Sequence, residues 1–333
     1  MLKVFDGVAA FEGSLYGSPT VLTIGNFDGV HRGHQELIGR AVARARKEGV
    51  PSVVFTFEPH PLMVLKPELK LKRLFDSIDR QERLAALGVD ILVVEPFSRR
   101  FSQLSPEKFL TENVIRPFQP KALVVGYDFS FGANRSGSID YLTRHAKSPA
   151  VPFDVEVVPP VTISIEGKDT IVSSTRIRQA LSAGKAAEAA ALLGRPYVVR
   201  GIVKKGAGRG RTIGIPTANI DPTVEAGIQP GVYAAYARLS GQTGAHAGRF
   251  AAMVNIGTNP TFTGDATTLH IEAHLPEYDG EKEGDLYGET MELHFVTRIR
   301  DERKFGSVAE LVAQIRRDIA AGLEALKPDG GTI

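Results

Sequence analysis

The chain has 333 residues, of which 43% are hydrophobic and 23% are charged, so it is long for one domain and too apolar for an extensively disordered protein. It contains no cysteine, which excludes disulfides, thiolate zinc sites, iron–sulfur clusters and cysteine nucleophiles. The 40 basic and 38 acidic residues leave a net charge of +2, too balanced for a protein whose whole surface binds nucleic acid or anionic lipid. We therefore expect two domains that bind any anionic ligand locally.

The first half of the chain alternates short apolar runs with helical patterns. Buried strands are predicted at residues 21–24, 53–57, 91–94 and 122–125. After the first of these, apolar residues from Leu37 to Ala45 recur at helical spacing. This alternation is typical of an open, mainly parallel sheet covered by helices.

The second half has a different pattern. Residues 180–193 form an Ala- and Leu-rich helical segment that ends at Gly194, which we take as the link between two domains, 1–194 and 195–333. Short β-rich segments follow at residues 197–203, 231–239, 251–256, 270–275 and 290–296, without a helical pattern between them. Only the end, from residue 308 to about 326, is strongly helical. This order predicts a small antiparallel β-barrel or sandwich with a C-terminal helix.

A segment rich in Gly and His, GNFDGVHRGH at residues 25–34, lies where the first predicted strand ends and the first helix begins. In an open α/β sheet this edge binds ligands, because free backbone N–H groups and the helix dipole face it. His31 and His34 are three residues apart, so both can point toward a phosphate from the first helical turn. Gly-rich turns are common in α/β folds, and a His-x-x-His pair could instead bind a metal, so the segment alone leaves these alternatives open.

A second Gly-rich segment, GAGRGRTIGIPTAN at residues 206–219, opens the C-terminal half. Its glycines and arginines could wrap an anion through backbone N–H groups and guanidinium donors. It is not a dinucleotide-binding fingerprint, since the third glycine of that motif would fall on Arg211. The basic residues of this region are Arg200, Lys204, Lys205, Arg209 and Arg211. Without interleaved aromatic residues they indicate nucleic-acid binding only weakly.

Further strings follow both segments in a fixed order. In the first half these are FEPHP at 57–61, VGYDFSFG at 125–132 and SSTRIR at 173–178. In the second half they are NIGTNPTF at 255–262, HIEAH at 270–274 and DLYG at 285–288, with a longer and more acidic stretch than usual at 276–284. Together with the His-x-Gly-His and Pro-Thr-Ala-Asn motifs, these strings resemble the prokaryotic bifunctional riboflavin kinase/FAD synthetase family.

For residues 1–194 the resemblance implies a Rossmann-like nucleotidylyltransferase domain, an FMN adenylyltransferase, in which His31 and His34 are catalytic and contact the ATP phosphates. The other ATP- and phosphate-binding residues would be Gly25, Phe27, Asp28, Gly33, Ser174, Thr175 and Arg178. The hydroxyls before the second helical pattern could also be ordinary helix caps. Flavin-binding residues would be Phe57, His60, Asp128 and Phe129, although aromatic residues at such positions often belong to the core.

For residues 195–333 the resemblance implies a riboflavin kinase domain built on the β-barrel. Its ATP-binding residues would be Gly208, Arg209, Gly210, Arg211, Gly214, Pro216, Thr217 and Asn219. The Thr217 hydroxyl and the Asn219 amide oxygen would hold Mg²⁺, which prefers hard oxygen ligands. Glu272 would be the base for the 5′-hydroxyl of riboflavin, whereas its alternating strand pattern alone indicates only a solvated residue.

The resemblance therefore implies an enzyme that phosphorylates riboflavin with ATP to FMN and then adenylylates FMN to FAD and pyrophosphate, with Mg²⁺ at both sites. The sequence lacks a secretion signal and a long apolar run, so we expect a cytoplasmic protein with small-molecule partners, neither nucleic acid nor membrane, and its oligomeric state stays open. One alternative is a monofunctional kinase whose N-terminal domain binds nucleotide without catalysis. Another is a nucleotide-sensing regulator or nucleic-acid binder, although no DNA-reading helix pattern occurs.

Overall fold

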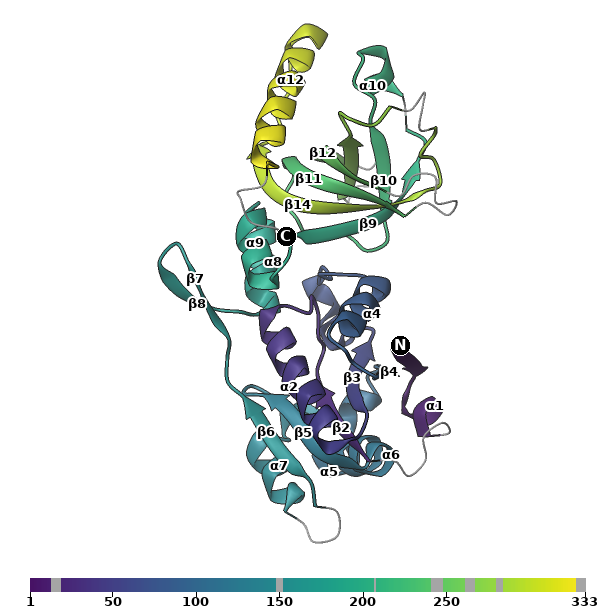
Figure 1. The fold of residues 1–333 in the computed structure, drawn as a ribbon, viewed down its shortest axis with the longest axis vertical. Helices are drawn as coiled ribbons and strands as arrows, with labels where there is room; N and C mark the ends of the chain where they lie inside the picture. Colours follow the sequence, from purple (N-terminus) through teal and green to yellow (C-terminus); the bar gives the residue numbers. More distant parts are fainter. Residues whose placement is uncertain are drawn as a thin grey trace. The chain divides into compact units, whose positions relative to one another are not determined.

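The computed structural model describes residues 1–12, 19–147, 152–206, 208–240, 248–260, 267–279 and 284–327. The chain divides into two compact units (Figure 1). The first comprises Met1–Leu71 and Ser77–Ser173, and the second comprises Lys72–Asp76 and Ser174–Ile333. The division between functional domains at residues 194 and 195 stays a prediction.

The first unit is built on a six-stranded parallel sheet with the strand order β1-β4-β3-β2-β5-β6. Its strands are β1 (Lys3–Asp6), β2 (Thr20–Ile24), β3 (Ser52–Glu58), β4 (Ile91–Pro96), β5 (Pro120–Gly126) and β6 (Asp154–Val158). Every residue of β2 is buried, which explains its continuous apolar run, because a central parallel strand is covered on both faces. The order reverses between β2 and β5, so the crevice at their carboxyl ends is where an α/β sheet binds ligands.

Helices cover both faces of this sheet. The helices of this unit are α1 (Val8–Glu12), α2 (Arg32–Glu48), α3 (Pro61–Leu65), α4 (Ser77–Ala86), α5 (Pro106–Leu110), α6 (Arg116–Phe118) and α7 (Ile139–Ala146), with a π-helical segment at Thr111–Ile115 and single 3-10 turns at Pro67–Leu69, Phe101–Gln103 and Ala133–Arg135. α2 packs against β2, β3 and β5. A separate hairpin, β7 (Thr162–Ile165) with β8 (Lys168–Ile171), forms a second sheet that the sequence analysis did not predict.

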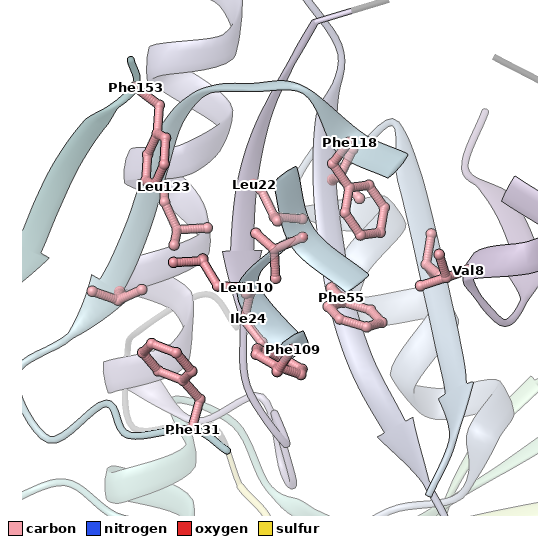
Figure 2. Packing of buried hydrophobic residues seen from close by; sticks show 14 of the residues in the cluster. Val8, Leu22, Ile24, Phe55, Phe109, Leu110, Phe118, Leu123, Phe131 and Phe153 are labelled. Carbon is pink, nitrogen blue, oxygen red and sulfur yellow. The ribbon is translucent and has the colours of Figure 1, made fainter. Parts of the chain in front are cut away.

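The core on one face of the sheet is rich in phenylalanine (Figure 2). Phe109 and Leu110 of α5 and Phe118 of α6 meet Leu22 of β2 and Phe55 of β3 there. All five side chains are at most 4% exposed. This packing fixes the position of the strand ends from which the first candidate site is built.

The second unit contains a closed antiparallel barrel with the strand order β10-β13-β12-β11-β14-β9, which confirms the barrel rather than the sandwich. The strands are β9 (Tyr197–Lys204), β10 (Ala218–Pro222), β11 (Gly231–Ser240), β12 (Gly248–Pro260), β13 (Thr267–His274) and β14 (Thr290–Arg300). The predicted C-terminal helix is α12 (Val308–Ala325), which packs against β11, β12 and β14. Where no helix was predicted between strands, one short helix, α10 (Arg209–Thr212), forms in the Gly-rich segment.

The helical segment predicted at residues 180–193 belongs to two helices of the second unit, α8 (Ser174–Ser182) and α9 (Ala186–Leu193). The predicted helical segment is interrupted, because Gly184, with a φ of 71°, turns the chain between the two helices. The predicted stop at Gly194 is confirmed, since that residue caps α9 in the left-handed conformation.

The segment Lys72–Asp76 folds with the second unit although its neighbours in sequence belong to the first. The carboxylate of Asp76 accepts a hydrogen bond from the Thr223 hydroxyl at 2.8 Å. The carbonyl of Lys72 accepts one from Nε of Arg178 at 2.8 Å. Hydrogen bonds therefore join this short segment both to the loop after β10 and to α8.

Two glycines give opposite expectations for alanine substitution. A Cβ on Gly201 of β9 would lie 2.4 Å from the carbonyl oxygen of Asp221 on the paired strand, whereas a Cβ on Gly39 of α2 would meet nothing within 4 Å. We expect Gly201→Ala to lower the free energy of unfolding of the barrel by roughly 1–3 kcal/mol. Gly39→Ala should raise the free energy of unfolding of the first unit by up to about 1 kcal/mol. Urea unfolding followed by NMR signals from each unit checks both, and equal effects would contradict this explanation.

Candidate functional site

The first candidate site is the connection from β2 to α2. The N–H of Gly25 donates to the carbonyl of Phe55 at 3.1 Å, which extends the pairing of β2 with β3. The chain then turns through left-handed residues, Phe27 with a φ of 47°, Gly29 with 89° and Val30 with 38°. Phe27 and Val30 are each 1% exposed. Non-glycine residues rarely adopt this conformation, least of all a β-branched one, so the surrounding structure must hold it.

The structure brings His31 and His34 together at the start of α2. His31 is the N-cap, and its Nδ1 accepts the backbone N–H of His34 at 3.3 Å. The two rings stack with centroids 3.6 Å apart and an angle of 16° between their planes. A Cβ on Gly33 would lie 3.2 Å from Cε1 of His31, so a residue without a side chain leaves room for that ring. Asp28, in the preceding loop, is buried.

The ring of His34 is kept neutral near pH 7. Its Nδ1 is buried and has no hydrogen-bond partner among the described residues. Burial, and then the nearby His31, lower the pKa of His34 well below its usual value. A neutral imidazole can donate a hydrogen bond to a phosphate oxygen from one ring nitrogen and accept one at the other.

The other candidates of the first unit have mixed environments. Phe57 and Phe129 are half-buried and pack against the core of Figure 2. His60 is buried and caps α3, with its Nδ1 accepting the N–H of Leu62 at 3.1 Å. Asp128 is exposed at the end of β5. Of these four residues, Asp128 is therefore the most accessible to a ligand, while His60 has a clear structural role.

An open cavity of about 470 Å³ lies beside the first turns of α2. Its lining comes from α2 and from the residues at the start of the β7–β8 hairpin. The lining residues are Arg32, Gln35, Glu36, Val161, Thr162 and Ile163. The cavity thus lies between the start of α2 and the β7–β8 hairpin, and its lining includes both charged and apolar side chains.

The remaining phosphate candidates lie in the second unit. Ser174 and Thr175 begin α8, where Ser174 is half-buried and Thr175 is exposed. Arg178 uses its Nε for the hydrogen bond to the carbonyl of Lys72. The guanidinium of Arg178 is therefore oriented by the segment Lys72–Asp76.

The second candidate site lies on the barrel wall. The strand register places Lys204 of β9, Asn219 of β10, Glu272 of β13 and Asn255 of β12 in one row across four strands. Directly opposed residues of antiparallel strands have their side chains on the same face. The next row is apolar and buried, and consists of Val203, Ile220, Ile271 and Ile256. The polar row therefore faces outward, with the carboxylate of Glu272 flanked by two amides.

The Gly-rich segment folds tightly over this row. A Cβ on Gly206 would lie 2.1 Å from Nδ2 of Asn219, so only glycine lets the backbone pass so close to that amide. A Cβ on Gly210 would lie 2.3 Å from the carbonyl oxygen of Ile215, whose own N–H donates to the Gly210 carbonyl at 2.8 Å. Nδ1 of His274 is 2.8 Å from the Pro216 carbonyl and fixes the approach to β10.

The basic residues of this region do not act as one cluster. Arg211 is exposed, lies over the ring of Tyr287 at 5.9 Å and donates to its hydroxyl at 3.5 Å. Lys204 forms an ion pair with Asp221. Gly208 and Gly214 are exposed with φ values of 70° and 73°. Arg211 is thus presented to solvent beside the two open glycines.

Arg200 belongs to a buried network on β9 and β14. Its Nη2 lies 2.6 Å from Oε1 of Glu292, which also accepts two hydrogen bonds from Arg238 at 2.8 and 3.1 Å and lies 3.2 Å from Nε2 of His294. Burial alone would raise the pKa of Glu292, but the hydrogen bonds with His294 and Arg238 and the charge of Arg200 outweigh it and lower that pKa from 4.5 to about 2. This arginine stabilises the barrel wall.

We expect this network to make the second unit sensitive to acid. Because the pKa of Glu292 is depressed when folded, its contribution is fully present above pH 4.5 and is lost as the pH falls toward 2. At neutral pH the Glu292 carboxylate contributes of the order of 3 kcal/mol to the free energy of unfolding. Urea-unfolding midpoints from pH 7 to pH 2, read from the ring signals of Tyr197 and Tyr233, check this. Glu292→Gln should lower the midpoint at pH 7 and flatten its pH dependence; an unchanged profile would refute the assignment.

Oxygen donors for a divalent cation are present next to this row. Among the described residues, no three or more His, Asp or Glu side chains are grouped to hold a metal. Thr217 and Asn219 are two residues apart where the chain enters β10, so an extended chain places the hydroxyl and the amide oxygen on the same side. Such a donor set fits Mg²⁺, which takes few protein ligands and keeps waters and substrate phosphates.

Some of the expected residues lie outside the described part of the chain. These are residue 207 of the Gly-rich segment, residues 261–262 of the NIGTNPTF string and residues 280–283 of the acidic stretch. The side chain of Arg209 is also outside it, although its backbone begins α10.

Three residues that lie at these sites are not among the candidates predicted from the sequence. Nε2 of Gln35 donates to the Val30 carbonyl at 2.8 Å, and Oγ1 of Thr56 donates to the Asn26 carbonyl at 3.3 Å. Asn255 flanks Glu272 in the polar row. Gln35 follows His34 directly and was the easiest to find, whereas Thr56 and Asn255 depend on strand pairing.

Two family models match separate segments of the chain. Residues 15–176 match the family described as FAD synthetase, and residues 193–326 match the family described as riboflavin kinase. The first segment contains the β2–α2 connection and the second contains the barrel row. Each candidate site thus lies within one of the two matches.

Curated relatives match over most of the chain. The bifunctional riboflavin kinase/FMN adenylyltransferase of Listeria monocytogenes is 39% identical over 300 residues, which is 90% of either chain. The enzyme of the same name from Escherichia coli K12 is 37% identical over 298 residues, again 90% of each chain. That of Bacillus subtilis is 35% identical over 302 residues.

A solved structure described as a macrolide-efflux protein from Streptococcus pneumoniae has a TM-score of 0.82 and 33% sequence identity. It covers 97% of this chain and 98% of its own. In the described residues of the present chain, no helix has the length and apolar character required to cross a membrane.

Proposed function

Because the chain belongs to the family of bifunctional riboflavin kinases/FMN adenylyltransferases, we propose that residues 195–333 phosphorylate riboflavin to FMN and that residues 1–194 adenylylate FMN to FAD. The observation that carries this proposal is the match of both family models, at residues 15–176 and 193–326. The first match contains the β2–α2 connection, and the second contains the polar row of the barrel. A monofunctional kinase is not favoured, because the FAD synthetase match includes the paired histidines. We expect the protein to act in the cytoplasm on these small molecules.

In adenylyl transfer, a phosphate oxygen of FMN forms a bond to the α-phosphorus of ATP as the bond to the departing pyrophosphate breaks. The backbone of the Gly25–Val30 loop and the start of α2 provide a positive end for the phosphates. His31 and His34 donate hydrogen bonds to the charge that develops on the leaving group. The resemblance to the family also assigns phosphate binding to Ser174, Thr175 and Arg178, and this assignment stays a proposal.

The role of the flavin candidates follows from the same scheme. The half-buried Phe57 and Phe129 would contact the flavin with their accessible ring atoms, and the exposed Asp128 would contact a polar group of FMN. His60 holds the start of α3 in place. Asp28, buried in the loop, and Gly33, which leaves room for the His31 ring, keep the loop in its binding shape.

In the kinase reaction, Glu272 accepts the proton of the riboflavin 5′-hydroxyl as that oxygen attacks the γ-phosphorus of ATP and ADP leaves. The Gly-rich segment with Gly208, Gly210, Gly214 and Arg211 surrounds the ATP phosphates, and Pro216 leads into β10. Thr217 and Asn219 would hold Mg²⁺, which neutralises phosphate charge when bound. We propose Mg²⁺ for the adenylylation site as well.

Incubating the full chain with riboflavin, ATP and Mg²⁺ and separating the flavins by chromatography tests the whole assignment. We expect FMN to appear first and FAD to follow with release of pyrophosphate. FMN without FAD would instead support a monofunctional kinase. Formation of neither flavin would overturn the proposed function.

A further inference from the structure

The loop that carries the adenylylation site is held in an unfavourable conformation. Two of its non-glycine residues, Phe27 and Val30, have positive φ values of 47° and 38°. A backbone of this kind persists only where neighbouring groups determine it. Burial of both side chains is one such determinant. A second determinant is a pair of hydrogen bonds from side chains outside the loop, which the loop carbonyls accept.

The first hydrogen bond comes from Thr56 of β3, which is fully buried. Its hydroxyl donates to the carbonyl of Asn26 at 3.3 Å. This carbonyl belongs to the peptide that precedes Phe27, and a planar trans peptide points its N–H opposite to its carbonyl. The bond therefore orients the peptide from which the φ of Phe27 is measured. The ring of Phe27 is directed back over Gly25, where a Cβ would lie 3.1 Å from it.

The second hydrogen bond comes from Gln35 in the first turn of α2. Its side-chain amide donates to the carbonyl of Val30 at 2.8 Å. That carbonyl belongs to the peptide that precedes His31, the N-cap of α2. The bond thus fixes the peptide from which the His31 ring extends.

Both bonds converge on one ring. Phe27 meets the ring of His34 edge-on at 5.3 Å, and His31 stacks on its face at 3.6 Å. Each of these two neighbours directly follows a peptide held by Thr56 or by Gln35. The orientation of the His34 ring therefore depends on Thr56 and Gln35 through its two ring neighbours, Phe27 and His31.

We propose that Thr56 and Gln35 are positioning residues for adenylyl transfer, which fix the stacked histidines by holding the two ends of the loop between β2 and α2. This inference rests on the proposed function of the first unit. Rates of group transfer fall steeply when a catalytic group is displaced by about 1 Å, by up to roughly 100-fold. The two residues should accordingly affect turnover more than ATP binding.

The test uses the full chain and substitutions that remove one donor each. For Thr56→Val and Gln35→Met we expect kcat of FMN adenylylation to fall roughly 10- to 100-fold, with the KM for ATP changed less than about threefold. Thr56→Ser, which keeps the hydroxyl, should recover most of the activity. Riboflavin phosphorylation by the same polypeptides should be unchanged.

The chain offers a matched control for the threonine. Thr23 of β2 is also fully buried, but its hydroxyl has no hydrogen-bond partner among the described residues. Thr23→Val should therefore leave adenylylation unchanged. If Thr56→Val behaves like Thr23→Val, or if Thr56→Ser is as impaired as Thr56→Val, the positioning role is overturned.

Histidine NMR separates this inference from the proposed function. In the wild type we expect the pKa of His34 to lie well below its usual value, so that the ring stays neutral near pH 7. In Thr56→Val and Gln35→Met its titration should move upward as the ring is released into water. Unchanged His34 titration in both variants would overturn the inference. A wild-type chain that forms no FAD would overturn the proposed function, while the titrations would still decide whether these residues position the histidines.

Discussion

Replacing Glu272 by alanine is expected to abolish FMN formation from riboflavin while FMN adenylylation is retained. The carboxylate lies in the outward polar row between Asn219 and Asn255 and is the proposed acceptor of the 5′-hydroxyl proton. Removing a general base costs roughly 100- to 10,000-fold in rate. Phosphorylation of riboflavin, and adenylylation assayed separately with FMN supplied, measure the two activities in the same preparation.

Glu277→Ala is a suitable control, because this carboxylate is exposed and follows β13 within a few residues. It should leave both activities close to those of the wild type. Parallel loss of both activities in folded Glu272→Ala would contradict the division of chemistry between the two parts of the chain. Substantial kinase activity in Glu272→Gln would show that the carboxylate is not the base.

The second large effect is expected when His31 and His34 are both replaced by alanine. FAD formation should then be lost and FMN formation retained, because these rings are the proposed donors to the leaving pyrophosphate. Loss of one donor to such a group costs roughly 100- to 1,000-fold, so the double variant should fall below detection. Pyrophosphate release with FMN and ATP as substrates is the direct measurement.

His145→Ala in the same unit controls for loss of an imidazole. This ring stacks on Tyr141 within α7, and its Nδ1 lies 3.2 Å from the Tyr141 carbonyl. Its removal should leave FAD formation intact. Undiminished pyrophosphate release in the His31 and His34 double variant would refute their role on the phosphates.

Much of the fold could be predicted because burial leaves a direct pattern in the sequence. The predicted runs at 21–24 and 122–125 lie in β2 and β5, and every residue of these two runs is buried. The β7–β8 hairpin was not predicted, because it has little buried surface and therefore no strong apolar pattern. The break between α8 and α9 was missed because the Ala-rich composition outweighed the single Gly184.

The candidate sites divide in the same way. The pairing of His31 with His34 follows from helical spacing and could be predicted. The contact of Thr56 with the loop depends on the pairing of β3 with β2, and spacing along the chain contains no sign of it. Likewise, Asn255 lies next to Glu272 only through the barrel register.

The placement of Lys72–Asp76 in the second unit has a consequence for how the chain can be taken apart. No single cut separates the two compact units, since each is assembled from more than one stretch of sequence. A fragment starting at residue 195 would lack α8, α9 and the carboxylate of Asp76 that receives the Thr223 hydroxyl. Module exchange between relatives at that point would therefore require the donor and recipient to match at residues 72–76 as well as at the junction.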